Sequence, residues 1–470
     1  MSDYPKHHGM REKPAMEFLC SLDSYDYESQ GSFGRLFRSE HHARPLYCNP
    51  TTLAEMGKAG GIMESDGTEP KTNVPAGMVF LGQFIDHDIT LDTESSLSAV
   101  NDPADITNFR TPTLDLDCIF GEGPEDEPFL YENNSLKLLT GEANNNIGQG
   151  PALEKHDLAR NGQGVAIIGD PRNDENRILS QLQLLFIRFY NKVYDHISTA
   201  DADPKELYEE ARRLTTWHYH WIVLNEFLPS MVGEDLMIDI MANGRKWYRP
   251  HNGPYIPVEF SVAAYRFGHS MIPQKVKLQS SGATHDLFSS AVGRGFSRIS
   301  NLNQVVEWKM FFDVDGSHSF AEKLDTKMAK DLLALPFITS GENSLATRNL
   351  LRGQSFLLPS GETVASCMGI DPAIMTRIAD GIDDNINGTG IDFPNGTPLW
   401  YYILAEAEII GKDGDPGEGL GPIGGRIVGE TILGLIELDH ESFMNQNRNW
   451  VPNLGPASDF TMKDLIDFVG

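Results

Sequence analysis

The feature that most constrains the fold of this chain is a long run of helical periodicity. Between residues 178 and 197, apolar side chains recur at every third or fourth position, namely Ile178, Leu182, Leu185, Phe189, Val193 and Ile197. This spacing places them on one face of an α-helix. Asp170 and Pro171 form a start signal, because aspartate accepts free N–H groups and proline is pre-set for the first turn. We therefore expect a long amphipathic helix with one buried face.

Weaker periodicity predicts more helices at 76–86, 211–227, 260–271, 321–334, 344–352, 398–410 and 423–438. Strand signals are few and short, so the expected fold class is mainly α with long irregular loops and little β. No internal repeat is visible, and no linker separates the motifs described below. We expect an irregular arm at 1–30 followed by one large domain at 31–470.

The charge and composition of the chain disfavour several classes of binding partner and several cellular locations. The 470 residues include 67 acidic and 38 basic ones, a net charge of −29, which disfavours nucleic acid and anionic membranes as partners. No apolar run is long enough to span a bilayer or to serve as a signal peptide near the start. Four cysteines without metal-type spacing suit a reducing compartment. We expect a cytoplasmic protein, with export that needs no N-terminal signal as the alternative.

A polar trio lies inside an apolar helix. Gln83, Asp86 and His87 are spaced i, i+3 and i+4, which places them on one helical face, and their neighbours are apolar. Buried polar groups need hydrogen-bond partners or a ligand. A satisfied hydrogen-bond cluster and a ligand site both fit this pattern.

A second polar segment follows. Thr111, Thr113, Asp115 and Asp117 alternate with other residues, so an extended loop would present their oxygens on one side. Hard oxygen ligands suit Ca²⁺, and Asp88 is a further candidate carboxylate. An ordinary acidic turn is the alternative.

Two more positions stand out. Arg172 and Glu175 open the long helix, where a positive charge opposes the helix dipole, although a surface ion pair would also fit. His269 follows Gly268 on an apolar helix, where a flat ligand could approach the backbone, although a packed core histidine is the commoner case. By contrast, His218 and His220 are two residues apart and point in different directions, so we expect no metal site there.

Five motifs in the same order resemble those of the animal-type haem peroxidases, of the peroxidase–cyclooxygenase superfamily, and especially its short bacterial members. The motifs are Gly82–Asp88, Arg172–Glu175, Tyr265–His269, Leu345–Arg352 and Leu420–Val428. The resemblance covers most of the chain, from about Phe33 to Leu438.

The resemblance implies a haem b cofactor and a role for each matching position. His87, Arg172 and Gln83 match the catalytic residues on one haem face, and His269 matches the iron ligand, with Asn349 accepting its other ring N–H. Asp86 and Glu175 match the carboxylates that form ester bonds to haem. Arg266 and Arg352 are further expected cofactor-binding residues. The expected calcium ligands are Asp88, Thr111, Thr113, Asp115 and Asp117.

The implied reaction is reduction of hydrogen peroxide and oxidation of a small donor through a ferryl–porphyrin radical. Asn176 stands where some members have a methionine linked to the haem. This difference disfavours chloride and leaves bromide, iodide, thiocyanate, phenols or other organic donors. Gln183 and Tyr190 replace histidines that are frequent in animal members, and we expect these replacements to affect packing and not the iron site.

Two alternatives remain. A haem-dependent fatty-acid dioxygenase would use a radical tyrosine three residues before the iron ligand, where this chain has Arg266. A calcium-binding structural protein that has lost haem would have no need for the set Gln83, His87, Arg172 and His269.

Overall fold

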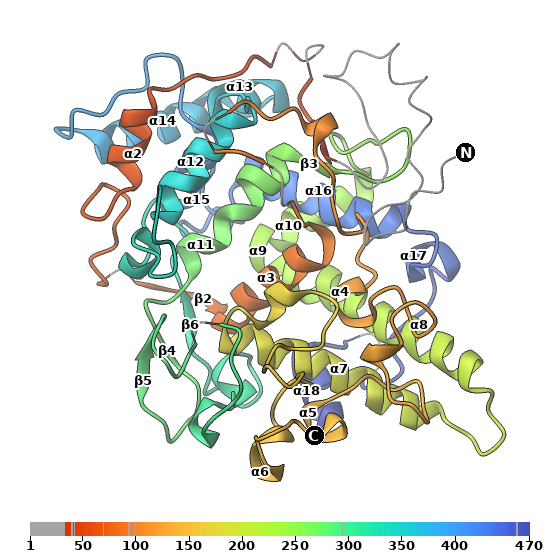
Figure 1. Cartoon of the computed structure of the whole chain (residues 1–470). Coiled ribbons are helices and arrows are strands. Elements are labelled where there is room, and N and C mark those ends of the chain that lie inside the picture. Colours follow the sequence, from red (N-terminus) through yellow and green to blue (C-terminus); the bar gives the residue numbers. More distant parts are fainter. Residues whose placement is uncertain are drawn as a thin grey trace.

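The computed structural model describes residues 33–470 except 39, 40, 42, 69, 93, 94, 98, 294, 457 and 458. The predicted irregular arm at 1–30 lies outside the described residues. Figure 1 shows the described chain as a closely packed body of helices joined by long loops.

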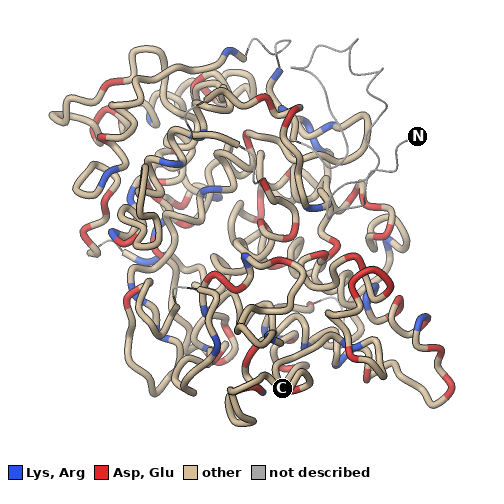
Figure 2. The backbone as a smooth tube through the Cα atoms, viewed as in Figure 1, with Lys and Arg blue, Asp and Glu red and all other residues tan. Residues whose placement is uncertain are grey.

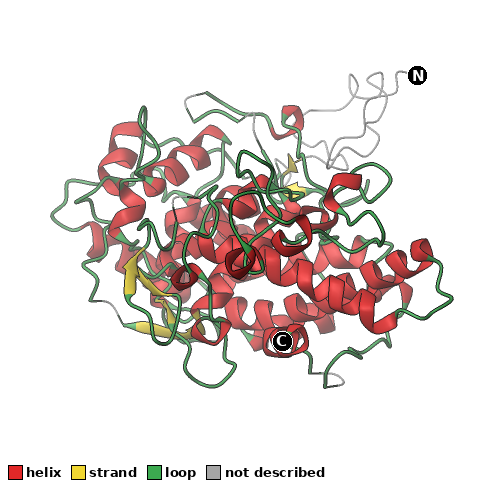
Figure 3. Ribbon diagram, turned by 60° about the horizontal axis from the view of Figure 1, so that its bottom comes forward, coloured by secondary structure: helices red, strands yellow, loops and turns green. Residues whose placement is uncertain are grey.

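Helices dominate the described residues, which confirms the mainly α fold class (Figure 3). The α-helices are α2 (Pro50–Gly57), α3 (Ala76–Ile89), α4 (Asp117–Phe120), α5 (Gly141–Asn144), α6 (Pro151–Glu154), α7 (Arg177–Ile197), α8 (Pro204–Ile222), α9 (Leu228–Val232), α10 (Glu234–Asn243), α11 (Gly268–Met271), α12 (Leu345–Ser355), α13 (Gly361–Met368), α14 (Pro372–Ile386), α15 (Leu399–Ile409), α16 (Pro422–Leu438), α17 (Phe443–Gln446) and α18 (Met462–Val469). Short strands pair into two-stranded sheets: β1 (Phe33–Gly34) with β3 (Ile256–Pro257), β2 (Lys71–Pro75) with β6 (Phe320–Glu322), and β4 (Lys275–Lys277) with β5 (Thr284–Asp286).

The predicted long helix is α7, and its start differs from the prediction. Asp170 and Pro171 begin a separate 3₁₀ helix, η5 (Pro171–Asp174), and α7 begins at Arg177. The side chain of Asn176 caps α7 by accepting the N–H of Leu179. A capping side chain satisfies one of the free N–H groups at a helix start, so the Asp170 cap begins η5 and the Asn176 cap begins α7.

Helix α3 lies in the middle of the packing. It contacts α7, α4, α11, η5 and the π-helical segment η6 (Val223–Phe227). Gly82 allows one of these close approaches, because a Cβ there would lie 3.2 Å from the ring of Phe227. A helix that is apolar on nearly every side is stable only when other elements surround it. This position gives α3 contact with several segments that are distant in the sequence.

The segment around His269 is more irregular than predicted. In place of one helix over 260–271, a π-helical turn η7 (Glu259–Ala263) and a 3₁₀ turn η8 (Ala264–Phe267) precede the short α11. Both carboxylate oxygens of Glu259 accept backbone N–H groups, those of Leu36 and Phe37, and so hold the start of the described chain against this segment.

The predicted helix over 321–334 is wrong. That stretch holds the end of β6 and, after a loop, the 3₁₀ helix η11 (Lys330–Leu333). Strand β6 pairs with β2, so tertiary pairing outweighs the helical spacing of its apolar residues. Among the described residues, no helix is long and apolar enough to cross a membrane. Figure 2 shows the basic positions scattered among the more numerous acidic ones.

Candidate functional site

His87 is held in a defined orientation on α3. Its ring is 6% exposed, and Nδ1 lies 2.8 Å from Oδ1 of Asn173 in η5. Burial and, to a smaller extent, the charge of Arg172 lower the pKa of His87 to about 4. The imidazole is therefore neutral near pH 7. Within the described part of the chain, Nε2 has no hydrogen-bond partner.

Arg172 is anchored beside His87. Its Nε lies 3.2 Å from each carboxylate oxygen of Asp170, and Nη2 donates to the same carboxylate at 2.8 Å and to the His87 carbonyl at 3.0 Å. Nη2 also donates to the Thr90 carbonyl at 2.5 Å. Burial alone would raise the pKa of Asp170, but Arg172 and Arg110 outweigh it and hold the pKa below its usual range. Nη1 of Arg172 is left without a partner among the described residues.

The two predicted ester carboxylates lie beside these groups. Gln83 donates through Nε2 to Oε1 of Glu175, and Asn176 donates to Oε1 of Gln83 at 3.5 Å. Burial raises the pKa of Glu175 to about 7. Asp86 is partly exposed, and one of its carboxylate oxygens accepts the hydroxyl of Thr90 at 3.1 Å. Gln83 of α3 therefore bonds to Glu175 and Asn176, the two residues between η5 and α7.

His269 is paired with Asn349, as the resemblance implied. Asn349 is on α12, and its Nδ2 lies 2.9 Å from Nδ1 of His269. In this amide orientation Nδ1 would accept, whereas the expected role has Asn349 accepting the ring N–H. Rotating the amide by 180° brings Oδ1 to Nδ1 and leaves Nε2 with its lone pair. Burial lowers the pKa of His269 to about 3, with a smaller contribution from Arg266.

His87 and His269 lie on neighbouring elements. Helix α11 packs against α3, and a Cβ on Gly268 would lie 3.9 Å from Val79 of α3. In each case an asparagine side chain engages Nδ1, and Nε2 has no hydrogen bond to any described residue. The structure therefore brings two motifs that are 182 residues apart into adjoining helices.

Arg266 and Arg352 form a cationic pair close to these helices. Arg266 donates from Nε to the Ser261 carbonyl at 2.9 Å, and Arg352 lies 3.3 Å from a carboxylate oxygen of Asp92. Burial lowers the pKa of both arginines, and the nearby charge of Arg266 helps to lower that of Arg352 to about 10. An anionic group bound near both guanidinium groups would offset this repulsion.

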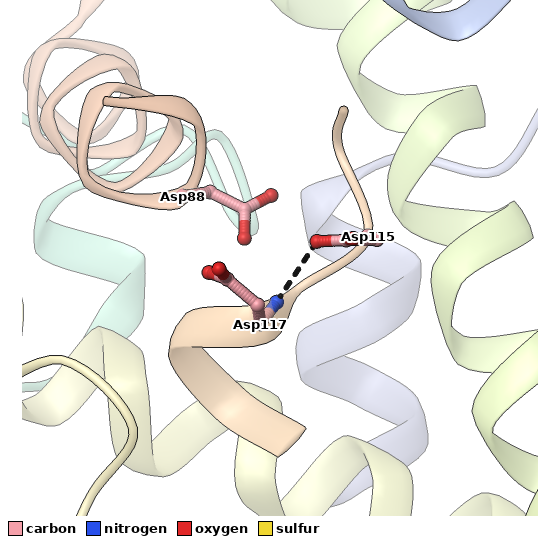
Figure 4. A group of neighbouring side chains, drawn as sticks. All are labelled: Asp88, Asp115 and Asp117. Carbon is pink, nitrogen blue, oxygen red and sulfur yellow. Dashed lines mark hydrogen bonds between the residues drawn. The ribbon is translucent and has the colours of Figure 1, made fainter. Parts of the chain in front are cut away.

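The predicted calcium residues converge on one place. Single oxygens from Asp88, Asp115 and Asp117 all lie within 4.8 Å of one another (Figure 4). Thr111 and Thr113 donate their hydroxyls to Asp115, at 2.8 Å and 3.0 Å. Burial, followed by the charges of Asp117 and Asp115, raises the pKa of Asp88. Three carboxylates in so small a volume repel one another unless a proton or a cation is bound.

This acidic cluster is connected to Arg172. Arg110 lies 3.3 Å from Asp117 and 2.8 Å from Asp170, and Asp170 in turn holds Arg172. His220 donates from Nε2 to the Leu114 carbonyl at 2.7 Å, so this histidine supports the loop and belongs to no group of possible metal ligands among the described residues.

Comparison with known proteins assigns the chain to a family. The model of the animal haem peroxidase family matches residues 95–374, which is more than half of the chain. The chain belongs to the animal haem peroxidase family. Relatives of this family member include a chorion peroxidase from Aedes aegypti, which is 24% identical over 314 residues, and the thyroid peroxidase of Mus musculus, which is 25% identical over 376 residues. Those alignments cover 63% and 75% of this chain.

The chain spans less than half the length of each of these relatives. The matched region covers 37% of the chorion peroxidase, 40% of the thyroid peroxidase and 13% of Dual oxidase 1 from Caenorhabditis elegans.

The solved structures that share the fold of this chain include the following two. Peroxidase A from Dictyostelium discoideum has a TM-score of 0.59 at 16% identity, covering 94% of this chain and 95% of its own. A fatty acid alpha-dioxygenase from Arabidopsis thaliana has a TM-score of 0.58 at 17% identity, covering 94% and 76%.

Sequence reasoning missed four polar residues that hold the site of this peroxidase-family protein. Asn173 contacts His87, and Gln183 contacts Asn173. Asp170 holds Arg172, and Arg110 in turn holds Asp170. Gln183 was expected to affect packing and not the iron site; its side chain bonds to Asn173, which in turn contacts His87. A signal was present, since Gln183 interrupts the apolar sequence of a helix whose middle is buried.

Proposed function

We propose that this protein is a haem-dependent peroxidase that reduces hydrogen peroxide and oxidises a small donor. The observation that carries the proposal is the arrangement of the two imidazoles. His87 and His269 lie on adjoining elements, each is engaged at Nδ1 by an asparagine, and Nε2 of each has no partner among the described residues. Family membership adds independent support for haem binding.

The residues present fit a haem. In the proposal, Nε2 of His269 binds the iron, with Asn349 as the partner of its other nitrogen. The mutually repelling pair Arg266 and Arg352 suits the carboxylates of the porphyrin. When bound, haem supplies the iron that coordinates peroxide and the redox capacity that oxidises the donor.

The chain itself moves the proton and stabilises charge. Neutral His87 has a free Nε2 that can accept a proton from peroxide and return it to the departing oxygen. Arg172 is fixed by Asp170 and by two backbone carbonyls, which leaves Nη1 to donate toward negative charge that develops between the oxygens. Both groups are positioned before the reaction, so little reorganisation is needed.

Asn176, the residue after Glu175, bears on which class of electron donor the protein oxidises. Asn176 caps α7 and contacts Gln83, and it offers no sulfur for a link to haem. We propose bromide, iodide, thiocyanate, phenols or other organic molecules as donors. We also propose a single haem peroxidase domain at 31–470.

One experiment separates the candidate functions. Purified protein expressed with ample haem should show a Soret band and stoichiometric pyridine haemochrome, and peroxide should drive oxidation of at least one of these donors. Oxygen uptake with palmitic acid and without peroxide would point to a dioxygenase; fatty acid alpha-dioxygenases are among the proteins that share the fold, and one is solved with palmitic acid. Protein without a Soret band would favour a structural role and overturn the proposal.

We propose that the cluster of Asp88, Asp115 and Asp117 binds Ca²⁺ and stabilises the fold. At a free Ca²⁺ concentration of 100 times Kd, binding adds about 2.7 kcal/mol to the free energy of unfolding. A chelator should therefore lower the melting temperature of the wild type, and Asp88→Asn should remove this difference. The matched control is Asp286→Asn, an exposed carboxylate in β5 that should keep the chelator effect. An equal melting temperature with and without Ca²⁺ would contradict the site.

We propose that Asp86 and Glu175 form ester bonds to haem. Acidified organic solvent should then leave the haem attached in the wild type and in each single variant, Asp86→Ala or Glu175→Ala. The double variant should release it, because no covalent link remains. Mass spectrometry of haem-bearing peptides would identify each bond, and haem that is fully extracted from the wild type would show that no ester forms.

A further inference from the structure

Two buried amides form a chain behind His87. Asn173 and Gln183 are both 0% exposed. Gln183 donates from Nε2 to the Cys118 carbonyl at 2.9 Å, Asn173 donates from Nδ2 to Oε1 of Gln183 at 2.7 Å, and Oδ1 of Asn173 lies 2.8 Å from Nδ1 of His87. An amide is costly to bury unless its groups are paired, and here both ends of each amide are used.

The Cys118 carbonyl, at the end of this series farthest from His87, fixes which group donates in each of these hydrogen bonds. A backbone carbonyl can only accept, so Gln183 must present its N–H₂ to Cys118 and its oxygen to Asn173. Asn173 must then present its N–H₂ to Gln183 and its oxygen to His87. Turning either amide around would bring two oxygens together inside the protein. Since Oδ1 of Asn173 can only accept, Nδ1 of His87 carries the proton.

The carbonyl that begins this chain is itself held in place. Cys118 is the second residue of α4, and its thiol donates to Asp88 at 3.4 Å. Gly169 packs closely beneath it, because a Cβ there would lie 2.7 Å from the Cys118 oxygen. The contacts run from His87 through Asn173, Gln183 and Cys118 to Asp88, which is the neighbour of His87 in the sequence. They form a closed ring across α3, η5, α7 and α4.

We propose that Gln183 is a positioning residue that selects the tautomer of His87, so that the neutral ring presents the Nε2 lone pair to the site. The inference rests on the proposed function in one respect, namely that peroxide is the molecule from which Nε2 accepts a proton. Without the hydrogen bonds that run from Gln183 through Asn173, the His87 tautomer with its proton on Nε2 becomes accessible. That form cannot accept a proton at Nε2.

The test uses Gln183→Met, which preserves length and volume but removes both hydrogen bonds. The matched control is Gln181→Met on the same helix. Gln181 is also buried and also bonded at both ends, to the His156 carbonyl at 2.7 Å and to the Val306 N–H at 3.4 Å, but it has no bond to Asn173. Each variant is compared with the wild type as ferrous haem protein with carbon monoxide bound.

The infrared stretch of carbon monoxide reports the tautomer directly. A ring with its proton on Nε2 donates a hydrogen bond to the bound molecule and lowers its stretching frequency, whereas a lone pair does not. Arg172 can donate to the bound molecule in every variant, so each spectrum is compared with that of the wild type. We expect one band at the same frequency in the wild type and in Gln181→Met, and an added band at lower frequency in Gln183→Met. The rate constant for peroxide consumption should fall roughly 5- to 30-fold in Gln183→Met alone, the factor expected from one or two lost buried hydrogen bonds.

A second change distinguishes tautomer selection from packing. Asn173→Asp places a carboxylate, which only accepts, against Nδ1. It is tested in the Gln183→Met background, where no amide oxygen faces residue 173, and there it should restore the wild-type band. A carbon monoxide spectrum in Gln183→Met identical to that of the wild type would overturn the inference.

The inference would also be overturned if Gln183→Met failed to bind haem and the double variant with Asn173→Asp showed no wild-type band. If the wild type consumes no peroxide but the infrared bands change as expected, the tautomer inference stands and the peroxidase proposal fails.

Discussion

Replacing His269 with alanine should abolish tight haem binding in the Asp86→Ala/Glu175→Ala background, where no ester bond can retain the haem. The proposed iron ligand is Nε2 of this residue, held by the contact between Nδ1 and Asn349. Loss of residues that merely support a ligand costs about 10- to 100-fold in metal affinity, so loss of the ligand itself should cost more than about 100-fold. The measurement is the haem content of the purified variant by pyridine haemochrome, together with haem transfer to apomyoglobin.

Asn349→Ala is the graded comparison for this prediction. It leaves the ligand in place and should weaken haem retention by about 10- to 100-fold without abolishing it. Added imidazole should partly restore a Soret band to His269→Ala. Stoichiometric, non-exchanging haem in His269→Ala, in the background without the two ester carboxylates, would mean that another residue binds the iron.

Replacing His87 with alanine should leave haem bound and slow peroxide activation by about 10²- to 10⁴-fold, the usual contribution of one general acid–base group. His87 has Nε2 available and neighbours Arg172, but in the proposal it does not bind the iron. The measurement is the bimolecular rate constant for the change of the Soret band after stopped-flow mixing with peroxide.

His218→Gln is the matched control. His218 is also buried, burial likewise lowers its pKa to about 4, and its ring is bonded to the Leu214 carbonyl, away from the site residues. This variant should react at the wild-type rate. An unchanged rate constant in His87→Ala, with haem fully bound, would refute the acid–base role.

Much of the fold was predictable from the sequence because its signals are local. The periodicity of Ile178 to Ile197 predicted α7, and the apolar run around Gln83 and His87 predicted α3. The failure at 321–334 has a tertiary cause, since β6 forms by pairing with β2 about 250 positions earlier in the chain. Spacing alone also could not show that the His269 segment divides into π, 3₁₀ and α turns, which depend on its packing against α15, α16 and α3.

The chemistry of the site was likewise predictable from the sequence only in part. Residue types in order along the chain were enough to predict a haem peroxidase family member and the group of Asp88, Asp115 and Asp117. Hydrogen-bond direction was not predictable, because it depends on which group lies at the far end of each amide.

Helical spacing and motif order are written along one dimension, so they were enough to predict most of the long helices and the family. Packing in three dimensions is what aligns Asn173, Gln183 and the Cys118 carbonyl behind His87 and lets Arg110 join Asp117 to Asp170. These contacts arise where α4, η5 and α7 meet α3. Buried polar groups must pair with whatever the packing brings within reach, and that choice is made in three dimensions.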